Sequence, residues 1–86
     1  MNHLETINSI IHKLKENKFN DWTSSMANAR DFSFTSTELL SKVAFELKRM
    51  QLEAPHIFKY VAIEALDLFN FCEHIGIIIK YPNDNE

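Results

Sequence analysis

The chain has 86 residues, of which 45% are hydrophobic, 12% aromatic and 24% charged, with a formal net charge of −3. These proportions are typical of one globular domain spanning residues 1–86, and they exclude both a second domain with its own core and an intrinsically disordered chain. A single cysteine excludes an intramolecular disulfide, and the first residues lack the basic start and apolar run of a secretory signal, so we expect a cytoplasmic protein.

The first predicted element is an amphipathic helix over residues 3–18. Its apolar side chains recur at steps of three and four residues, and the polar side chains fall mostly on the opposite face. The apolar positions are Leu4, Ile7, Ile10, Ile11 and Leu14. The pattern then breaks, and the following segment indicates no more than a short helix that begins at Asp21.

Residues 31–35 alternate polar and aromatic side chains, which predicts one short strand with Phe32 and Phe34 on its buried face. A capping-box pattern follows, in which the Thr35 hydroxyl accepts from the amide of Glu38 and the Glu38 carboxylate reaches back to the amide of Thr35. The pattern predicts a helix over about residues 36–50. Its core stripe consists of Leu39, Leu40, Val43, Leu47 and Met50.

Pro55 favours the start of a new helix. Between residues 57 and 75 apolar side chains occupy almost every side, which indicates the central helix of the core, covered on more than one face. Gly76, the only glycine, is placed for a left-handed cap at the end of this helix. Residues 77–81 then have strong strand propensity, and residues 82–85 are typical of a turn.

This order of elements resembles that of winged helix-turn-helix domains. Residues 58–69 and 74–80 are similar in residue type to the recognition helix and wing of that superfamily, most of all to the repeats at the C-terminal end of the bacterial selenocysteine elongation factor. The resemblance covers residues 32–84 as an order of elements. It implies a mostly α, winged-helix-like fold with three helices and a short two-stranded β element, and a compact helical bundle is the alternative.

The charges divide unevenly along the chain. Residues 1–52 carry seven basic and six acidic side chains, whereas residues 53–86 carry two basic and six acidic ones. An acidic half with embedded aromatic residues suits a module that docks on the basic surface of a partner protein, as inhibitors, immunity proteins and adaptors do, although the same charge also serves plain solubility. The leading hypothesis is therefore a binding module that contacts a protein through Glu64, Asp67 and Glu73 on its C-terminal helix.

The alternative function, implied by the resemblance, is a winged-helix regulator that binds DNA or RNA. Basic side chains would contact phosphates, and a histidine or a tyrosine would reach the bases. The residues concerned are Lys42, Lys48, Arg49, His56, Lys59, Tyr60 and Lys80. Because the segment that would enter a groove belongs to the acidic half of the chain, a protein partner is favoured over nucleic acid. A homodimer is compatible with both hypotheses.

No group of residues predicts catalysis. Cys72 and His74 stand two residues apart on a predicted helix, so their side chains point to different faces. The four histidines form no pair at metal-ligand spacing, and a single glycine excludes the glycine-rich loops that bind nucleotide phosphates. We therefore expect no enzyme activity, no metal and no cofactor. No apolar stretch reaches the roughly 20 residues of a membrane span, so no membrane partner is expected.

Overall fold

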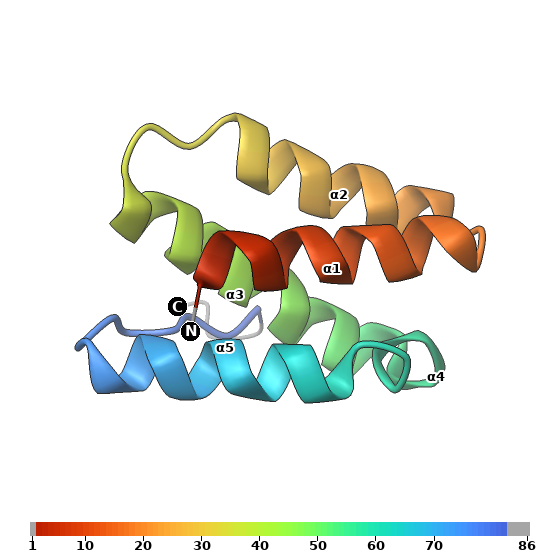
Figure 1. The fold of residues 1–86 in the computed structure, drawn as a ribbon. Helices are drawn as coiled ribbons and strands as arrows, with labels where there is room; N and C mark the ends of the chain where they lie inside the picture. The colour runs from red at the N-terminus through yellow and green to blue at the C-terminus, as the bar shows by residue number, and fades with distance from the viewer. Residues whose placement is uncertain (1, 83–86) are drawn as a thin grey trace.

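Helices make up most of the computed structural model, which describes residues 2–82 (Figure 1). They are α1 (His3–Glu16), α2 (Asn20–Asp31), α3 (Ser36–Glu53), α4 (Pro55–Phe58) and α5 (Ala62–His74). Residues 2–82 contain no strand, so the two-stranded β element expected for a winged-helix fold is absent from this part of the chain. The compact helical bundle is the fold class that fits.

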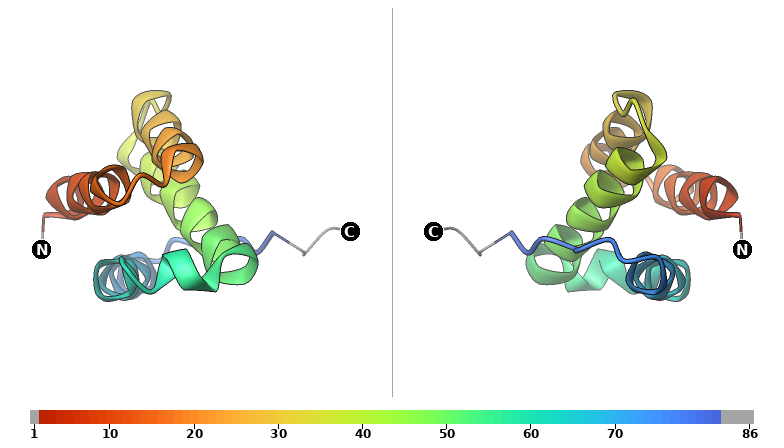
Figure 2. Two further views of the ribbon diagram at one scale, coloured as in Figure 1. Left: turned by 90° about the vertical axis from the view of Figure 1, so that its right-hand side faces the viewer. Right: turned by 90° about the vertical axis from the view of Figure 1, so that its left-hand side faces the viewer.

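The four long helices form a ring around one core (Figures 1 and 2). α1 packs against α2 and α5, and α3 packs against α2 and α5 on the other side of the ring. The short α4 follows α3 directly and packs against it. After α5 the chain turns back as an extended segment that crosses towards α3 (Figure 2).

Much of the core comes from the predicted stripes of α1 and α3, and α2 and α5 supply most of the rest. Ile7, Ile10 and Leu14 of α1 are fully buried, as the periodicity indicated. α1 ends at Glu16 rather than at residue 18, because Lys18 adopts a left-handed backbone conformation with φ of 63° that cannot continue a helix. On α3 the buried positions are Leu40, Val43, Ala44, Leu47 and Met50.

The predicted strand over residues 31–35 is wrong. Asp31 is the last residue of α2, and Phe32 and Phe34 are 67% and 93% exposed instead of buried. A short strand is stable only when its backbone pairs with another strand, and none is present within residues 2–82. Helix α2 therefore runs the full length from Asn20 to Asp31, and the two aromatic side chains project from the loop that follows it.

The predicted start of α3 is confirmed. The amide of Glu38 donates a hydrogen bond of 3.0 Å to the hydroxyl oxygen of Thr35, which is the N-cap residue. The Glu38 carboxylate accepts from the amide of Phe34 at 2.9 Å, one residue before the partner that the capping box predicted. These bonds satisfy amides at the beginning of the helix and fix the loop that carries Phe34.

The single long helix predicted over residues 57–75 is interrupted. α4 ends at Phe58, residues 59–61 form a turn, and α5 begins at Ala62. α5 is also less covered than predicted, because Ile63 and Leu66 on its outer side are 77% and 51% exposed. Gly76 caps the end of α5 as expected, with a left-handed φ of 85°.

The predicted strand over residues 77–81 is extended but pairs with no strand in the described part of the chain. Ile77 and Ile79 pack against the core, whereas Ile78 between them is 85% exposed. Of the turn predicted over residues 82–85, Pro82 lies in a turn and residues 83–85 lie outside the described residues.

Candidate functional site

The three carboxylates predicted to form one acidic surface lie on different sides of α5. Asp67 and Glu73 are exposed, but Glu64 is only 19% exposed and forms an ion pair with Lys13 of α1. At about 100° of rotation per residue, Glu64 and Glu73 point about 180° apart. Asp67 lies one turn after the exposed Ile63, and the exposed Glu73 follows Leu66 by two turns on nearly the same side of the helix. The outer face of α5 is therefore apolar with Asp67 and Glu73 towards its two edges, and it is not a continuous acidic surface.

The basic residues of α3 are engaged within the protein. Lys42 pairs with Glu38 at 3.0 Å and donates to the backbone oxygen of Phe32 at 3.1 Å. Arg49 pairs with Glu46 at 2.7 Å and with Glu53 at 3.2 Å, and these carboxylates raise the pKa of its guanidinium. These cations already have acidic partners.

The other residues predicted to bind nucleic acid are scattered. The ammonium of Lys48 lies 4.2 Å from the ring centre of Phe69 and 4.9 Å from that of Tyr81, where it makes cation–π contacts. Arg49 also lies over the Trp22 ring, at 4.4 Å. These aromatic contacts hold two of the predicted phosphate ligands against the body of the protein.

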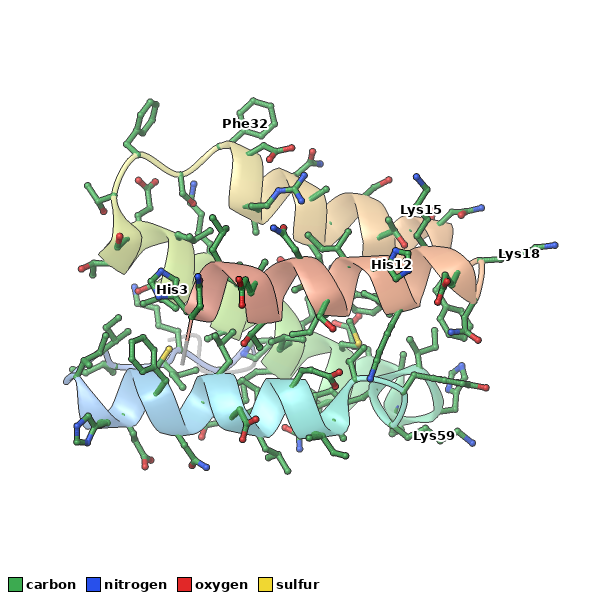
Figure 3. The ribbon with its side chains drawn as sticks, viewed as in Figure 1. His3, His12, Lys15, Lys18, Phe32 and Lys59 are labelled. Atoms are coloured by element: carbon green, nitrogen blue, oxygen red, sulfur yellow. The ribbon has the colours of Figure 1, made fainter. Side chains whose placement is uncertain are left out.

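His56 and Lys59 are exposed at the end of the bundle that also carries the exposed Lys15 and Lys18, as Figure 3 shows for the three lysines. Tyr60 packs its ring on Phe19, with the ring centres 5.5 Å apart. Lys80 is exposed on the C-terminal segment, away from this end. The predicted nucleic-acid residues therefore form no single surface.

A groove of about 580 Å³ lies between α2, the middle of α3 and the extended C-terminal segment. Its apolar lining comes from Ala29 and Phe32 at the end of α2, Phe45 on α3 and Ile78 on the C-terminal segment. Phe32 and Ile78 are 67% and 85% exposed, and Phe32 projects away from the bundle in Figure 3. Large apolar side chains thus stand at the groove with much of their surface open to solvent.

The polar lining of the groove consists of neutral and charged side chains. Ser25 and Asn28 on α2 and Ser41 on α3 supply hydrogen-bonding groups. Lys42, Glu46 and Lys80 supply the charges. Lys42 and Glu46 are neutralised by Glu38 and Arg49, whereas Lys80 forms no ion pair with any residue between 2 and 82. The groove therefore presents an apolar surface with one cation, Lys80, that no acidic side chain within residues 2–82 neutralises.

The loop beside the groove is held by Glu38. Its carboxylate accepts from the amide of Phe34 and pairs with Lys42, and these two interactions hold its pKa below the usual value. Lys42 in turn donates to the backbone oxygen of Phe32. One glutamate and one lysine thus tie the backbone that carries both exposed phenylalanines to the first turns of α3.

Two of the groove residues, Lys42 and Lys80, were expected to bind nucleic acid, and Phe32 was expected to be buried; the groove itself was not predicted. The available signal was the position of Phe32 and Phe34 directly before a capping box, where the chain is entering a helix and a loop is the expected structure. Phe45 carried no signal of its own, because it adjoins the predicted core stripe of α3.

The groups considered for catalysis are not brought together. Cys72 is fully buried, and burial raises the pKa of its thiol, while His74 is exposed. Among residues 2–82 no three histidine, cysteine, aspartate or glutamate side chains are placed to hold a metal ion. None of the helices in this range is long and apolar enough to cross a membrane.

A scan of protein-family models and searches of curated proteins and of solved structures found no match to this chain.

Proposed function

We propose that this chain is a non-enzymatic protein-binding module that holds an apolar segment of a partner protein in the groove between α2, α3 and the C-terminal segment. The observation that carries the proposal is the grouping of Phe32, Phe45 and Ile78 around one concave site, with Phe32 and Ile78 largely exposed. Exposed apolar side chains gathered at one groove are typical of surfaces that bind other macromolecules.

The shape and charge of the groove favour a particular kind of segment. A groove between two helices accepts a helix or an extended peptide that inserts apolar side chains at regular spacing. Lys80 adds one cation at the groove that no described residue neutralises. The partner segment therefore carries large apolar side chains with a carboxylate beside them, which pairs with Lys80.

Nucleic acid is the less favoured partner because of the state of the basic residues on α3. Lys42 and Arg49 would have to leave their carboxylate partners before they could bind phosphate. Glu38, Glu46 and Glu53 would then remain next to the phosphates and repel them. Affinity for nucleic acid depends on cations that neutralise phosphates, and cations already paired contribute little to it.

The acidic version of the protein-binding hypothesis now depends on the outer face of α5. Ile63 and Leu66, with Asp67 beside Ile63, offer an apolar and acidic surface that suits a basic partner. Glu64 is not part of this surface because Lys13 holds it. The groove remains the first choice since it is concave and gathers apolar side chains from three segments, and the outer face of α5 serves as the comparison surface in the test below.

The test is a selection of displayed random peptides of about 16 residues against the purified protein, followed by affinity measurements on two matched variants. Phe32→Ser removes an exposed aromatic side chain at the groove, and Ile63→Ser removes an exposed apolar side chain from the outer face of α5. We expect the selected peptides to lose at least about tenfold in affinity with Phe32→Ser, which is the effect of losing one buried apolar anchor. Ile63→Ser should leave the affinity unchanged.

The opposite pattern contradicts the groove. Loss of binding with Ile63→Ser alone, together with loss after Asp67→Lys, would place the interface on α5. A separate measurement uses random duplex and single-stranded oligonucleotides at low salt. Retention that falls steeply with salt and disappears with Lys42→Gln or Lys80→Gln would favour the nucleic-acid function instead.

A further inference from the structure

The extended C-terminal segment, residues 77–81, has the properties of a strand without a partner strand. Four of its five residues are β-branched or aromatic, which is the composition that strands favour. The last backbone hydrogen bond before it is donated by the amide of Ile77 to the oxygen of Cys72. Among the described residues, the amides of residues 78–81 donate no backbone hydrogen bond. Beyond Ile77, the segment therefore offers backbone donors that no residue between 2 and 82 uses.

Its side chains alternate between two faces, as in a sheet. Ile77 and Ile79 pack against the core, and the ring of Tyr81 lies under the ammonium of Lys48. Ile78 and Lys80 face away from the core, and Ile78 is 85% exposed. A second strand laid beside this segment would extend both faces, with its own inner side chains against the helices.

We propose that residues 77–81 of two copies of this chain pair as antiparallel strands about a two-fold axis. This inference goes beyond the proposed function, since it concerns the association of the chain with itself. A two-fold axis requires a surface that complements itself, and an antiparallel pair of identical strands meets that requirement. The pairing uses the free amides of Ile78 and Lys80 in an intermolecular ladder, because alternate amides of a strand face the partner and the amide of Ile77 is already bonded to Cys72.

The position of Lys80 and the length of the segment select one register for the two antiparallel strands. When Ile79 lies opposite Ile79 of the partner subunit, all five residues pair and Lys80 lies opposite Ile78 of the partner subunit. A shift of the axis to Lys80 places two lysines directly opposite each other, which is destabilising. A shift to Ile78 brings Gly76 into the ladder and leaves Tyr81 unpaired. The register centred on Ile79 is therefore the self-complementary one.

This register also keeps the two faces of the ribbon distinct. Tyr81 pairs with Ile77 of the partner subunit on the side of the helices, which is a favourable aromatic and β-branched pair. On the other side, the alkyl chain of Lys80 covers Ile78 of the partner subunit, and Ile78 is the most exposed apolar residue of the segment. Because Ile78 and Lys80 also line the groove, the dimer would place the grooves of both copies along one ribbon.

A ladder of five residues on each chain is short, so the association is expected to depend on concentration. The experiment is sedimentation velocity of the full chain at concentrations from about 5 µM to about 1 mM. The upper concentration is high enough to populate a dimer with a dissociation constant in the range of about 0.1–1 mM. We expect the average mass to rise from that of a 10.1 kDa monomer towards twice that value. Amide hydrogen exchange at Ile78 and Lys80 should slow as the concentration rises.

Two matched variants at one exposed position test the register. Ile78→Lys places a second lysine opposite Lys80 of the partner subunit at both symmetric sites, and we expect it to weaken association by about tenfold. Ile78→Glu is equally polar but places a carboxylate opposite that lysine, so association should be retained or strengthened. Adding Lys80→Glu to the Ile78→Lys variant places a carboxylate opposite the new lysine, so it should restore the association that Ile78→Lys weakens.

Three results would overturn the proposal. The first is a chain that remains monomeric at 1 mM, which is about the highest concentration at which a contact of this size is tested. The second is equal weakening by Ile78→Lys and Ile78→Glu, which would make burial of Ile78 the cause. The third is a dimer in which the amides of Ile78 and Lys80 exchange as fast as in the monomer.

Discussion

Replacing Lys13 by methionine is the perturbation that separates a structural ion pair from a partner-binding carboxylate. Lys13 and Glu64 join α1 to α5, and their side chains are 43% and 19% exposed. One carboxylate oxygen of Glu64 is buried and has no hydrogen-bond partner among the described residues. Without Lys13 this carboxylate would remain largely buried with no opposite charge.

The loss in the free energy of unfolding expected for Lys13→Met lies between two known limits. Pairs exposed to solvent contribute about 0–1 kcal/mol, and loss of one partner of a fully buried pair costs about 3–5 kcal/mol. Because the Lys13 and Glu64 pair is partly buried, Lys13→Met should cost about 1–2 kcal/mol in the free energy of unfolding. For a domain of this size each kcal/mol lowers the melting temperature by about 4–8 °C.

The assay is urea unfolding followed by circular dichroism, with Lys15→Met as the matched control on the exposed side of α1. Lys15→Met should change the free energy of unfolding by less than about 0.5 kcal/mol. Replacing both Lys13 and Glu64 by methionine should recover most of the loss, since no unpaired charge is then buried. Equal effects of Lys13→Met and Lys15→Met would refute the reasoning and return Glu64 to the candidate interface.

Three further predictions follow from local contacts. Thr35→Ala should cost about 1 kcal/mol in urea unfolding because it removes the N-cap of α3, and Thr37→Ala on the same turn should cost less. The pKa of Glu38 is held below its usual value of 4.5, so its stabilising contribution is present at neutral pH and is lost as the pH falls through the range below that value. Melting temperatures of Glu38→Gln should therefore decline less between about pH 6 and pH 3 than those of the unmodified protein. Lys18→Gly should raise the free energy of unfolding by up to about 1 kcal/mol, because glycine adopts the left-handed conformation of Lys18 without strain.

The parts of the fold that could be predicted are those decided by one segment at a time. The stripes of α1 and α3 follow from the period of a helix that buries one face, and Ile10 and Leu47 are fully buried as expected. Thr35 and Gly76 mark helix ends through contacts within a few residues, so their roles could also be predicted. These features could be predicted without knowing which other helices pack against them.

The predicted strands failed because a strand depends on a partner elsewhere in the chain. Alternation over residues 31–35 and β-branched composition over residues 77–81 are local properties, and neither segment pairs with a strand within residues 2–82. Phe32 and Phe34 were expected to be buried, and both are exposed. The proposed dimer would supply residues 77–81 with the partner strand that they lack within the described part of the chain.

The apolar helix near the C-terminus failed for a different reason. When apolar residues occupy almost every side, the sequence does not say which side faces the core. The structure places Ala65, Leu68 and Cys72 inside and leaves Ile63 and Leu66 outside. Only the neighbouring helices α1 and α3 decide this orientation.

The candidate site was the least predictable part. The groove joins Ala29, Phe45 and Ile78, which lie far apart in the sequence and meet only in the folded chain. Likewise, no local pattern pairs Lys13 with Glu64 or Arg49 with the ring of Trp22. Charge counts along the sequence therefore overestimated both the acidic surface of α5 and the basic surface of α3.

The most direct test of the account is a map of backbone amide chemical shifts when a peptide from the selection is added to isotope-labelled protein. The account predicts that the largest changes occur at residues lining the groove, such as Asn28, Ser41 and Phe45. It also predicts small changes at Ile63 and Asp67 on the outer face of α5. Changes concentrated on α5, with Asn28 and Ser41 unaffected, would contradict it.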